Sequence, residues 1–412
     1  MLKNFLFVLS RFRASSLLNI IGLSVAFTVF IIIMMQADYD LRFDKSVKNS
    51  DRIFRIEFIG GISGERQAVI CRPMLELIFK ASPHIVAGSL MSGWTSESFL
   101  KVENEGKQSL FKVIGQGIDS AFVSVFQPEM VEGSAHAIED PNTVLIPLSL
   151  ARKMFGQTSA VGKQVQADNN TSQTIGAVYR DFPDNSSVQN AVYYNIGNEN
   201  KNSWGNFNYN AFVLLDNPAV VAEVVEQMRK AIPLDNEVFR FGENHTFRLD
   251  ALKDLHFIND VSWDRTPKAS RQKLALLFAI AFAILIIAAI NFVNFSMALV
   301  PGRIRSINTQ KILGATLTEL RVKLVSEAAI MCLVSFVLAL ILVYMLSDVQ
   351  LVAGLIDAKM NLLAFPRLIG LSAVIALALG VFAGLYPAFY STSVPPALAL
   401  KGTFGLSPQG RM

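Results

Sequence analysis

The sequence is poor in the residues that build covalent and catalytic sites. Among its 412 residues there are only two cysteines and four histidines, and charged residues make up 17%. Cys71 lies in a polar part of the chain and Cys332 in a long apolar run, so we expect no disulfide between them. The histidines are scattered without the short spacings of a metal site: His84, His136, His245 and His256. We therefore expect no metal, no cofactor and no catalytic centre.

A phosphate-binding loop is also missing. The run 156–163 contains glycines and a lysine in the order of such a loop, but the spacing between the glycines is one residue too long. Gln164 stands where a serine or threonine would hold Mg²⁺. We interpret the run as a turn. The sequence predicts that the chain does not hydrolyse ATP by itself.

Long apolar runs are abundant. Hydrophobic residues make up 52% of the sequence, and the mean hydropathy is +0.39. Four runs are long enough to cross a hydrocarbon core of about 30 Å as helices, at 17–35, 274–300, 328–346 and 368–389. The first is too long for a signal peptide and lacks a small-residue cleavage site, so we expect a retained anchor. The second is longer than a bilayer requires, and we expect it to extend outward as a stalk.

The position of the basic residues predicts the orientation. Lys3, Arg11 and Arg13 precede the first run, and five basic residues lie between the second and third runs: Arg303, Arg305, Lys311, Arg321 and Lys323. Cytoplasmic loops carry such an excess of positive charge. Both termini are therefore expected in the cytoplasm and the large polar region outside. This distribution explains the net charge of +4 without nucleic acid.

The predicted fold class is a membrane α-helical protein with four transmembrane helices in a one-plus-three arrangement. A large α+β extracytoplasmic domain is inserted between the first and second helices. The expected parts are an amphipathic elbow helix at 1–16, the first transmembrane helix at 17–37, the exported domain at 38–270, and a three-helix membrane domain at 271–412 with a cytoplasmic loop at 301–327.

The exported domain shows separate strand and helix signals. Strands are predicted at 53–59, 99–103, 109–114, 143–146, 164–167, 174–179 and 209–215, and helices at 147–155 and after Asn217-Pro218. Asn104-Glu105-Gly106 marks a hairpin. Because helix and strand alternate irregularly, we expect two lobes with a boundary near 195–208.

Polar and small residues inside the apolar runs predict helix packing. Asn19, Asn291 and Asn294 are expensive in hydrocarbon unless they are paired, so they are expected to face other helices. They could line a transport path, but hydrogen bonds between helices are the favoured interpretation. In the fourth run Gly380 and Gly384 continue a small-residue stripe from Ser372 and Ala376, which indicates close helix approach. The partner helix could belong to this chain or to a second copy.

Four segments carry a resemblance to a known family. They are 41–44 with 51–55, then 178–186, then 291–295 with 303–315, and finally 384–388 with Pro396 and 400–402. Together they resemble the MacB/FtsX-type permeases of ABC transporters, the mechanotransmission family that includes LolC- and LolE-like proteins. The resemblance covers nearly the whole chain.

The resemblance implies a mechanism and partners. Two permease subunits pair, as a homodimer or a heterodimer, and each binds a cytoplasmic ABC ATPase subunit through the loop between the second and third helices. On this basis the expected ATPase-coupling residues are Arg303, Arg305, Ile307, Lys311, Leu313 and Gly314. The loop departs from the family pattern at 306 and at 308–310, where an acidic and a basic position are lost.

The resemblance leaves two functions open. One is ATP-driven export or extraction of a peptide, lipoprotein, drug or other amphiphile across the bacterial inner membrane, with a periplasmic adaptor as a further partner. The alternative is a non-transporting transmitter that regulates a periplasmic partner such as a cell-wall hydrolase. Membrane lipid is an expected partner in either case, and nucleic acid is not.

Overall fold

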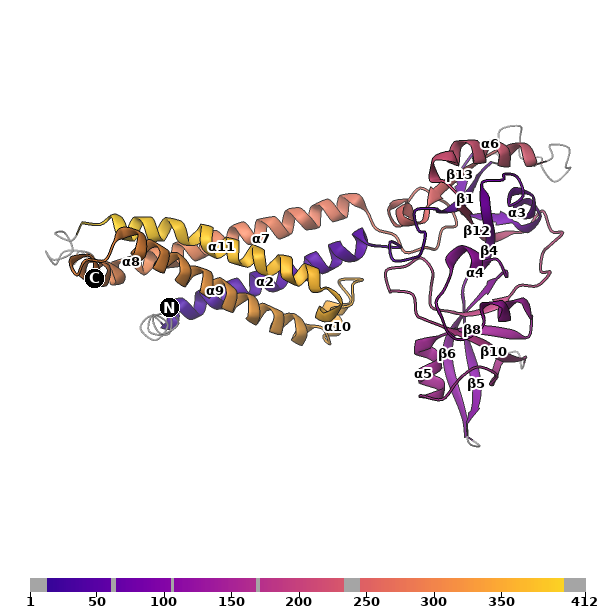
Figure 1. Ribbon diagram of the computed structural model, residues 1–412, viewed down its shortest axis with the longest axis horizontal. Coiled ribbons are helices and arrows are strands. Elements are labelled where there is room, and N and C mark those ends of the chain that lie inside the picture. Colours follow the sequence, from indigo (N-terminus) through magenta and orange to yellow (C-terminus); the bar gives the residue numbers. More distant parts are fainter. Residues whose placement is uncertain (1–12, 61–63, 105–106, 168–170, 233–244, 396–412) are drawn as a thin grey trace, which may run out of the picture. The chain divides into compact units, whose positions relative to one another are not determined.

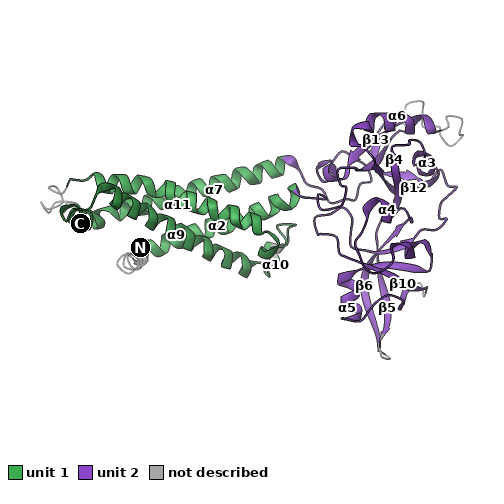
Figure 2. Cartoon of the chain, in the orientation of Figure 1, with its two compact units in different colours: residues 1–41, 272–412 green, residues 42–271 purple. Residues whose placement is uncertain are grey.

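A computed structural model describes residues 13–60, 64–104, 107–167, 171–232 and 245–395. The chain divides into two compact units, one formed by Met1–Leu41 with Gln272–Met412 and the other by Arg42–Arg271 (Figure 2). Each unit has its own apolar core. The predicted elbow helix lies almost wholly outside the described residues, and Pro396 and residues 400–402 of the resemblance lie outside them as well.

Four long helices form the first unit, and each is apolar enough to cross a membrane (Figure 1). They are α2 (Arg13–Leu41), α7 (Arg271–Ala298), α9 (Leu317–Leu346) and α11 (Pro366–Ser393). Shorter helices are α8 (Val300–Ile312), α10 (Gln350–Ala353) and η4 (Leu362–Ala364). With 28 residues, α7 is shorter than α2 with 29 and α9 with 30, so its length does not single it out as a stalk.

Helix α9 packs against both α2 and α11. Phe27 of α2 meets Phe336 of α9 edge to face, with ring centroids 6.3 Å apart, in a core of buried apolar side chains. At the other end of α2, Gln36 Oε1 accepts hydrogen bonds from the backbone N–H groups of Asp357 and Ala358, at 2.8 and 3.2 Å. The loop between α9 and α11 is thereby fixed to α2.

Helix α7 is much less covered than the other three. Of the apolar 18-residue stretch in α7, only 17% is buried within the chain, whereas 33–44% of the corresponding stretch is buried in α2, α9 and α11. Its buried side is narrow and is formed by Leu274, Ala281, Ala288 and Phe292. The opposite side exposes large apolar side chains, among them Phe282, Ile287 and Ile290. Lipid or another protein must therefore cover most of this helix.

The second unit is α+β and is built on a thirteen-stranded sheet. Its strands are β1 (Ile53–Ile59), β2 (Arg66–Gln67), β3 (Val69–Cys71), β4 (Ile85–Ser92), β5 (Ser96–Asn104), β6 (Lys107–Ile118), β7 (Met130–Gly133), β8 (Thr143–Pro147), β9 (Gln164–Ala167), β10 (Ser172–Tyr179), β11 (Val192–Asn195), β12 (Phe207–Leu215) and β13 (Thr246–Ala251). Its helices are α3 (Arg72–Ile78), α4 (Phe122–Phe126), η1 (Ala135–Glu139), α5 (Leu148–Phe155), η2 (Pro218–Val220), α6 (Val221–Ala231) and η3 (Leu252–Phe257).

The sheet serves two lobes, and the chain passes between them twice (Figure 1). The first lobe packs α3 and α6 on β1, β12 and β13, and the second packs α5 on β5, β8 and β10. The predicted boundary at 195–208 is the return crossing; the outward crossing, between β4 and β5, was not predicted. Between the two halves of the path, β4 and β6 pair at Met91 and Ile118. A third apolar cluster lies around this junction.

All seven strands predicted from the sequence are confirmed, and so are the two helices. Pro147 immediately precedes α5, and Asn217 Oδ1 caps η2 by accepting a hydrogen bond from the N–H of Ala219, at 3.0 Å. In α6, Val224 and Met228 are buried as the helical period requires, and so is Ile232 directly after the helix. Local sequence signals are strong at these positions because turn residues flank each element.

Candidate functional site

The connection between α7 and α9 is a helix with a tightly specified end. At its C-terminus the N–H of Gly314 donates to Lys311 O at 3.0 Å, and the N–H of Ala315 donates to Gln310 O at 3.0 Å. This is a Schellman motif, and it needs the positive φ of +95° that Gly314 supplies. Thr316 then caps α9 in a reciprocal box with Glu319. The predicted loop 301–327 is therefore α8, a rigid turn and the first turns of α9.

The turn presents an apolar tip. Ile312 is 62% exposed, Leu313 80% and Leu317 47%. Arg305 is exposed on the outer face of α8, whereas Ile307 is buried with Val300 and Ile304 on its inner face. Of the predicted coupling residues, Arg305, Leu313 and Gly314 are thus accessible, and Ile307 holds α8 in place.

Lys311 fastens α8 to the end of α11. Its Nζ donates hydrogen bonds to Thr392 O at 2.7 Å and to Val394 O at 2.9 Å. These are C-terminal helix carbonyls, which lack an intrahelical donor and favour a nearby cation. Burial lowers the pKa of the Lys311 ammonium, and the neighbouring Arg321 lowers it further. Arg321 itself donates to Thr392 Oγ1 at 3.1 Å and lies over the Phe389 ring.

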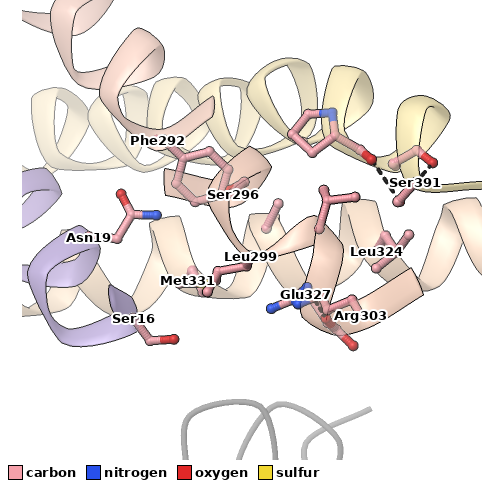
Figure 3. A pocket seen from close by; sticks show the side chains of 15 residues that line it. Ser16, Asn19, Phe292, Ser296, Leu299, Arg303, Leu324, Glu327, Met331 and Ser391 are labelled. Atoms are coloured by element: carbon pink, nitrogen blue, oxygen red, sulfur yellow. Dashed lines mark hydrogen bonds and ion pairs between the residues drawn. The ribbon is translucent and has the colours of Figure 1, made fainter. Parts of the chain in front are cut away.

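Arg303 fastens the other end of α8 to α9. Its Nη1 donates to Glu327 Oε2 at 3.3 Å, and both side chains are mostly buried. They border a cavity of about 40 Å³ that Ser16 and Asn19 of α2 also line (Figure 3). Ser16 Oγ and Arg303 Nε have no hydrogen-bond partner among the described residues. A cavity of this size has room for about three waters, by the volume of roughly 10–15 Å³ that one requires.

The small-residue stripe of α11 lies against α9 of the same chain. A Cβ built on Gly380 would lie 2.8 Å from Ala329 Cα, and one on Gly384 would lie 2.6 Å from Ala328 Cβ. Ser372 and Ala376 are buried along the same stripe. The partner helix that the sequence left open is therefore α9.

Asn291 and Asn294 do not face other helices of this chain. Both are exposed on α7, while Phe292 between them is buried. Contacts within this chain do not test the prediction that these two asparagines face another helix, because α7 turns Ala281, Ala288 and Phe292 inward. Asn19 is buried at the cavity instead.

The remaining polar motifs are structural. Lys163 Nζ donates to Thr158 Oγ1 at 3.0 Å and lies over the Phe155 ring, so the run 156–163 is the predicted turn between α5 and β9. His84 pairs with Asp216, and Asp216 raises the pKa of this imidazole. No group of three or more potential metal ligands occurs within the described part of the chain.

Four span-capable helices, a large α+β unit inserted after the first, and a short helix with a capped turn between the second and third define a polytopic membrane protein with a large inserted domain. The MacB-like periplasmic core domain matches residues 16–231, and the FtsX-like permease C-terminal domain matches residues 278–396. The chain belongs to the MacB/FtsX family of permeases.

Individual relatives are distant. The chain is 25% identical over 296 residues to the macrolide export ATP-binding/permease protein MacB of Chromobacterium violaceum. That match covers 70% of this chain and 43% of the relative, so the chain spans less than half of its length.

Two solved structures resemble part of the chain. A domain of a Porphyromonas gingivalis protein described as a permease is 24% identical, with a TM-score of 0.43, and the match covers 56% of this chain and 98% of that one. The periplasmic region of MacB from Actinobacillus actinomycetemcomitans is 14% identical, with a TM-score of 0.36, over 52% of this chain and 93% of that one.

Proposed function

We propose that the chain is the permease subunit of an ABC transporter of the mechanotransmission type. A separate cytoplasmic ATPase subunit binds the tip of α8, and its ATP-driven movement is passed through the membrane helices to the exported unit, which handles substrate for export or extraction. The observation that carries this proposal is the exposed apolar tip on a turn that is capped on both sides. Such a turn keeps its shape while a partner pushes on it.

The chemistry of the tip suits a protein partner. Full burial of an exposed leucine or isoleucine side chain contributes about 1.5–3 kcal/mol to binding. Ile312, Leu313 and Leu317 are the side chains that a partner would bury here. Exposed Arg305 adds a charge that can pair with an acidic rim and orient the partner. A cluster of apolar anchors beside an arginine is typical of an interface centre.

The uncovered face of α7 supports pairing with a second permease subunit. Pairing would bury Asn291 and Asn294, which could then form hydrogen bonds between the two copies. This arrangement gives these asparagines the helix partner that a single chain does not provide.

The proposal requires both termini and α8 in the cytoplasm and the unit 42–271 outside. The two native thiols are buried, so single cysteines can be introduced as probes. In intact cells we expect an impermeant maleimide to label Asn202→Cys and to spare Thr318→Cys, since both positions are exposed. Labelling of Thr318→Cys from outside would reverse the orientation.

The docking role of the tip predicts loss of the ATPase from the complex. Leu313→Asp combined with Arg305→Glu places negative charge at the centre of the contact, and we expect at least a tenfold loss of the ATPase that co-purifies with the parent chain, which is about 1.4 kcal/mol or more. The measurement is the ratio of ATPase to permease after detergent purification.

Leu363→Asp is the matched control, because Leu363 is 90% exposed in η4, between α9 and α11. It should leave the ratio unchanged. Lys311 is left intact, since its ammonium holds α11 and its replacement would disturb the bundle. Full retention of ATPase by the double variant would refute docking at this tip.

A further inference from the structure

Two short connectors join the exported unit to the membrane helices, and they meet inside that unit. The first, residues 42–44, follows α2, and the second, residues 258–270, precedes α7. Phe43 is buried and stacks on His256 of η3, just before the second connector, with ring centroids 3.8 Å apart and planes 3° from parallel. His256 Nδ1 is 2.9 Å from Pro267 O, so this stack also contacts the second connector near its end.

Asp44 fixes the first connector to the loop after β10. It is fully buried and accepts hydrogen bonds from Ser186 Oγ at 3.0 Å and from the N–H and Oγ of Ser187 at 2.6 Å. Its own N–H donates to Asn185 O at 2.8 Å. Asp44 holds these contacts at a φ of +58°, in the left-handed region that non-glycine residues seldom adopt. The surrounding contacts therefore determine this backbone conformation.

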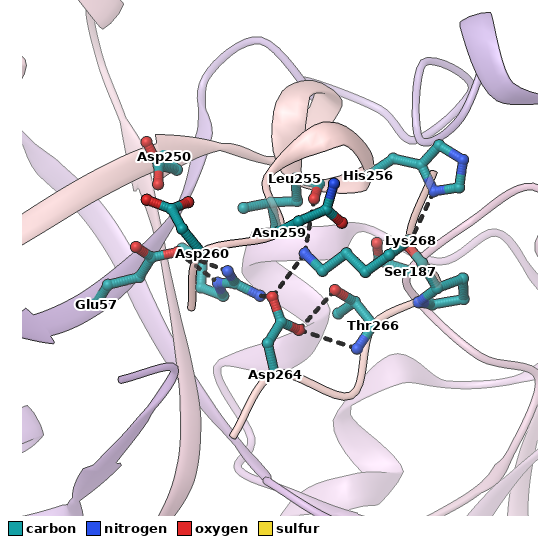
Figure 4. Close-up of polar contacts among 12 residues, drawn as sticks. Glu57, Ser187, Asp250, Leu255, His256, Asn259, Asp260, Asp264, Thr266 and Lys268 are labelled. Atoms are coloured by element: carbon teal, nitrogen blue, oxygen red, sulfur yellow. Dashed lines mark hydrogen bonds and ion pairs between the residues drawn. The ribbon is translucent and has the colours of Figure 1, made fainter. Parts of the chain in front are cut away.

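Asp264 fixes the second connector to strand β1 of the sheet. Its carboxylate, 3% exposed, lies 2.7 Å from Arg55 Nη1 and 2.6 Å from Lys268 Nζ. It also accepts from the N–H and Oγ1 of Thr266, at 2.9 and 2.7 Å (Figure 4). Arg55 belongs to β1 and pairs in turn with Glu57 at 2.5 Å. The connector is thus joined by charge to the strand that follows the first connector.

Backbone contacts hold the same connector along its length. The N–H of Ser262 donates to Arg66 O at 2.8 Å, and the N–H of Ala68 donates to Ser262 O at 3.0 Å. The N–H of Ala269 donates to His256 O at 2.8 Å, and Lys268 Nζ donates to Leu255 O at 2.7 Å. The segment has no helix or long strand of its own, and these contacts give it one fixed path.

We infer that Phe43, Asp44, His256, Asp264 and Lys268 form a connector joint that makes both connectors and β1 move as one body. Their role is to position the exported unit on the moving helices, and the inference rests on the proposed function. Buried ion pairs stabilise little compared with apolar packing, but they fix one geometry strongly, since any other leaves a buried charge unpaired. A joint that transmits displacement needs this property more than it needs stability.

The test uses the full chain with its ATPase in lipid nanodiscs and follows hydrogen exchange. Asp264→Asn keeps the shape of the side chain and removes its charge, and Lys268→Met removes one of the two cationic partners of the carboxylate while Arg55 remains. In both, we expect amides of residues 258–269 to exchange at least about tenfold faster, while β12 stays protected. Asp119→Asn is the matched control: Asp119 is another mostly buried carboxylate that accepts from Ser89 Oγ at 2.7 Å, and it does not contact either connector.

The functional readout is the change in exchange of the exported unit that ATP and vanadate produce. We expect the parent and Asp119→Asn to show it and the two joint variants to lose most of it, with ATP hydrolysis retained. Gln67 and Ser262 lie opposite each other in a single β-bridge. A disulfide between Gln67→Cys and Ser262→Cys should therefore restore the ATP-dependent change in exchange to the Asp264→Asn chain until a reductant is added.

The outcomes separate the two hypotheses. If the parent shows no ATP-dependent change in the exported unit, the proposed function fails. If the parent responds and both joint variants respond equally with loosened connectors, the joint does not transmit movement and the inference is wrong. Loss of the response in Asp119→Asn as well would assign the effect to general stability and overturn the inference.

Discussion

Replacing Gly380 with leucine should disrupt the membrane unit within a single chain. The new Cβ alone would lie 2.8 Å from Ala329 Cα and 3.0 Å from Cys332 Cβ. Because Ala329 Cα belongs to the backbone of α9, it cannot move aside without moving the helix. Overpacking of this kind costs about 1–3 kcal/mol, occasionally more. We expect the high end here, because the contact is between helix backbones. The measurement is resistance of the detergent-solubilised chain to denaturation by added SDS.

Gly370→Leu provides the matched control on the same helix. No atom lies within 4 Å of a Cβ at that position. Leucine has a higher helix propensity than glycine by roughly 0.8–1 kcal/mol, so this variant should be as stable as the parent or slightly more stable. Equal stability of Gly380→Leu and Gly370→Leu would show that α9 and α11 do not pack as described.

Removing Glu327 should release α8 from α9. Glu327→Leu leaves the Arg303 guanidinium largely buried without its carboxylate, and breaking a buried pair on one side typically costs about 3–5 kcal/mol. The expected result is loss of stability of the membrane unit together with weaker ATPase retention, since α8 carries the tip. Both are measured on the same purified complex.

The double variant Arg303→Met with Glu327→Leu separates charge from packing. Replacing both partners with apolar side chains of similar size is often neutral or stabilising, so this chain should recover most of the lost stability. If the double variant is as unstable as Glu327→Leu alone, the pair does not account for the effect and the cavity beside it does.

The elements predicted from sequence are those with a local signal. In β12 and in α6 the period of apolar residues and the flanking turn residues mark the element without help from the rest of the fold. Strand β4 was missed because its burial alternates poorly and its pairing with β12 is long-range. Strand β11 is short and is defined by its parallel pairing with β6, which no local pattern reveals.

The sequence located the connection between α7 and α9, but it did not reveal the contacts that its residues make. Basic residues between two apolar runs marked the turn between α7 and α9, yet the roles of these residues depend on tertiary partners. Lys311 resembles a docking residue in sequence, and only the end of α11 shows that its ammonium binds carbonyls. Glu327 carried one signal that could have been used, since an acidic residue at the edge of a span usually has a partner. Asn308, buried without a partner for its amide among the described residues, had no signal at all.

The double crossing between the lobes bears on how such a protein can diversify. Both connectors arise from the first lobe, and residues 96–195 form a nested segment whose two ends leave and rejoin that lobe at neighbouring strands, β4 and β12. A recombination event that exchanges this segment alters only the second lobe. The contacts that β1 and residues 256–268 make in the connector joint remain unchanged. Asp44 is the exception, because its serine partners lie within the exchanged segment. The second lobe can therefore change in sequence while the rest of the connector joint stays the same, provided that the exchanged segment keeps Ser186 and Ser187.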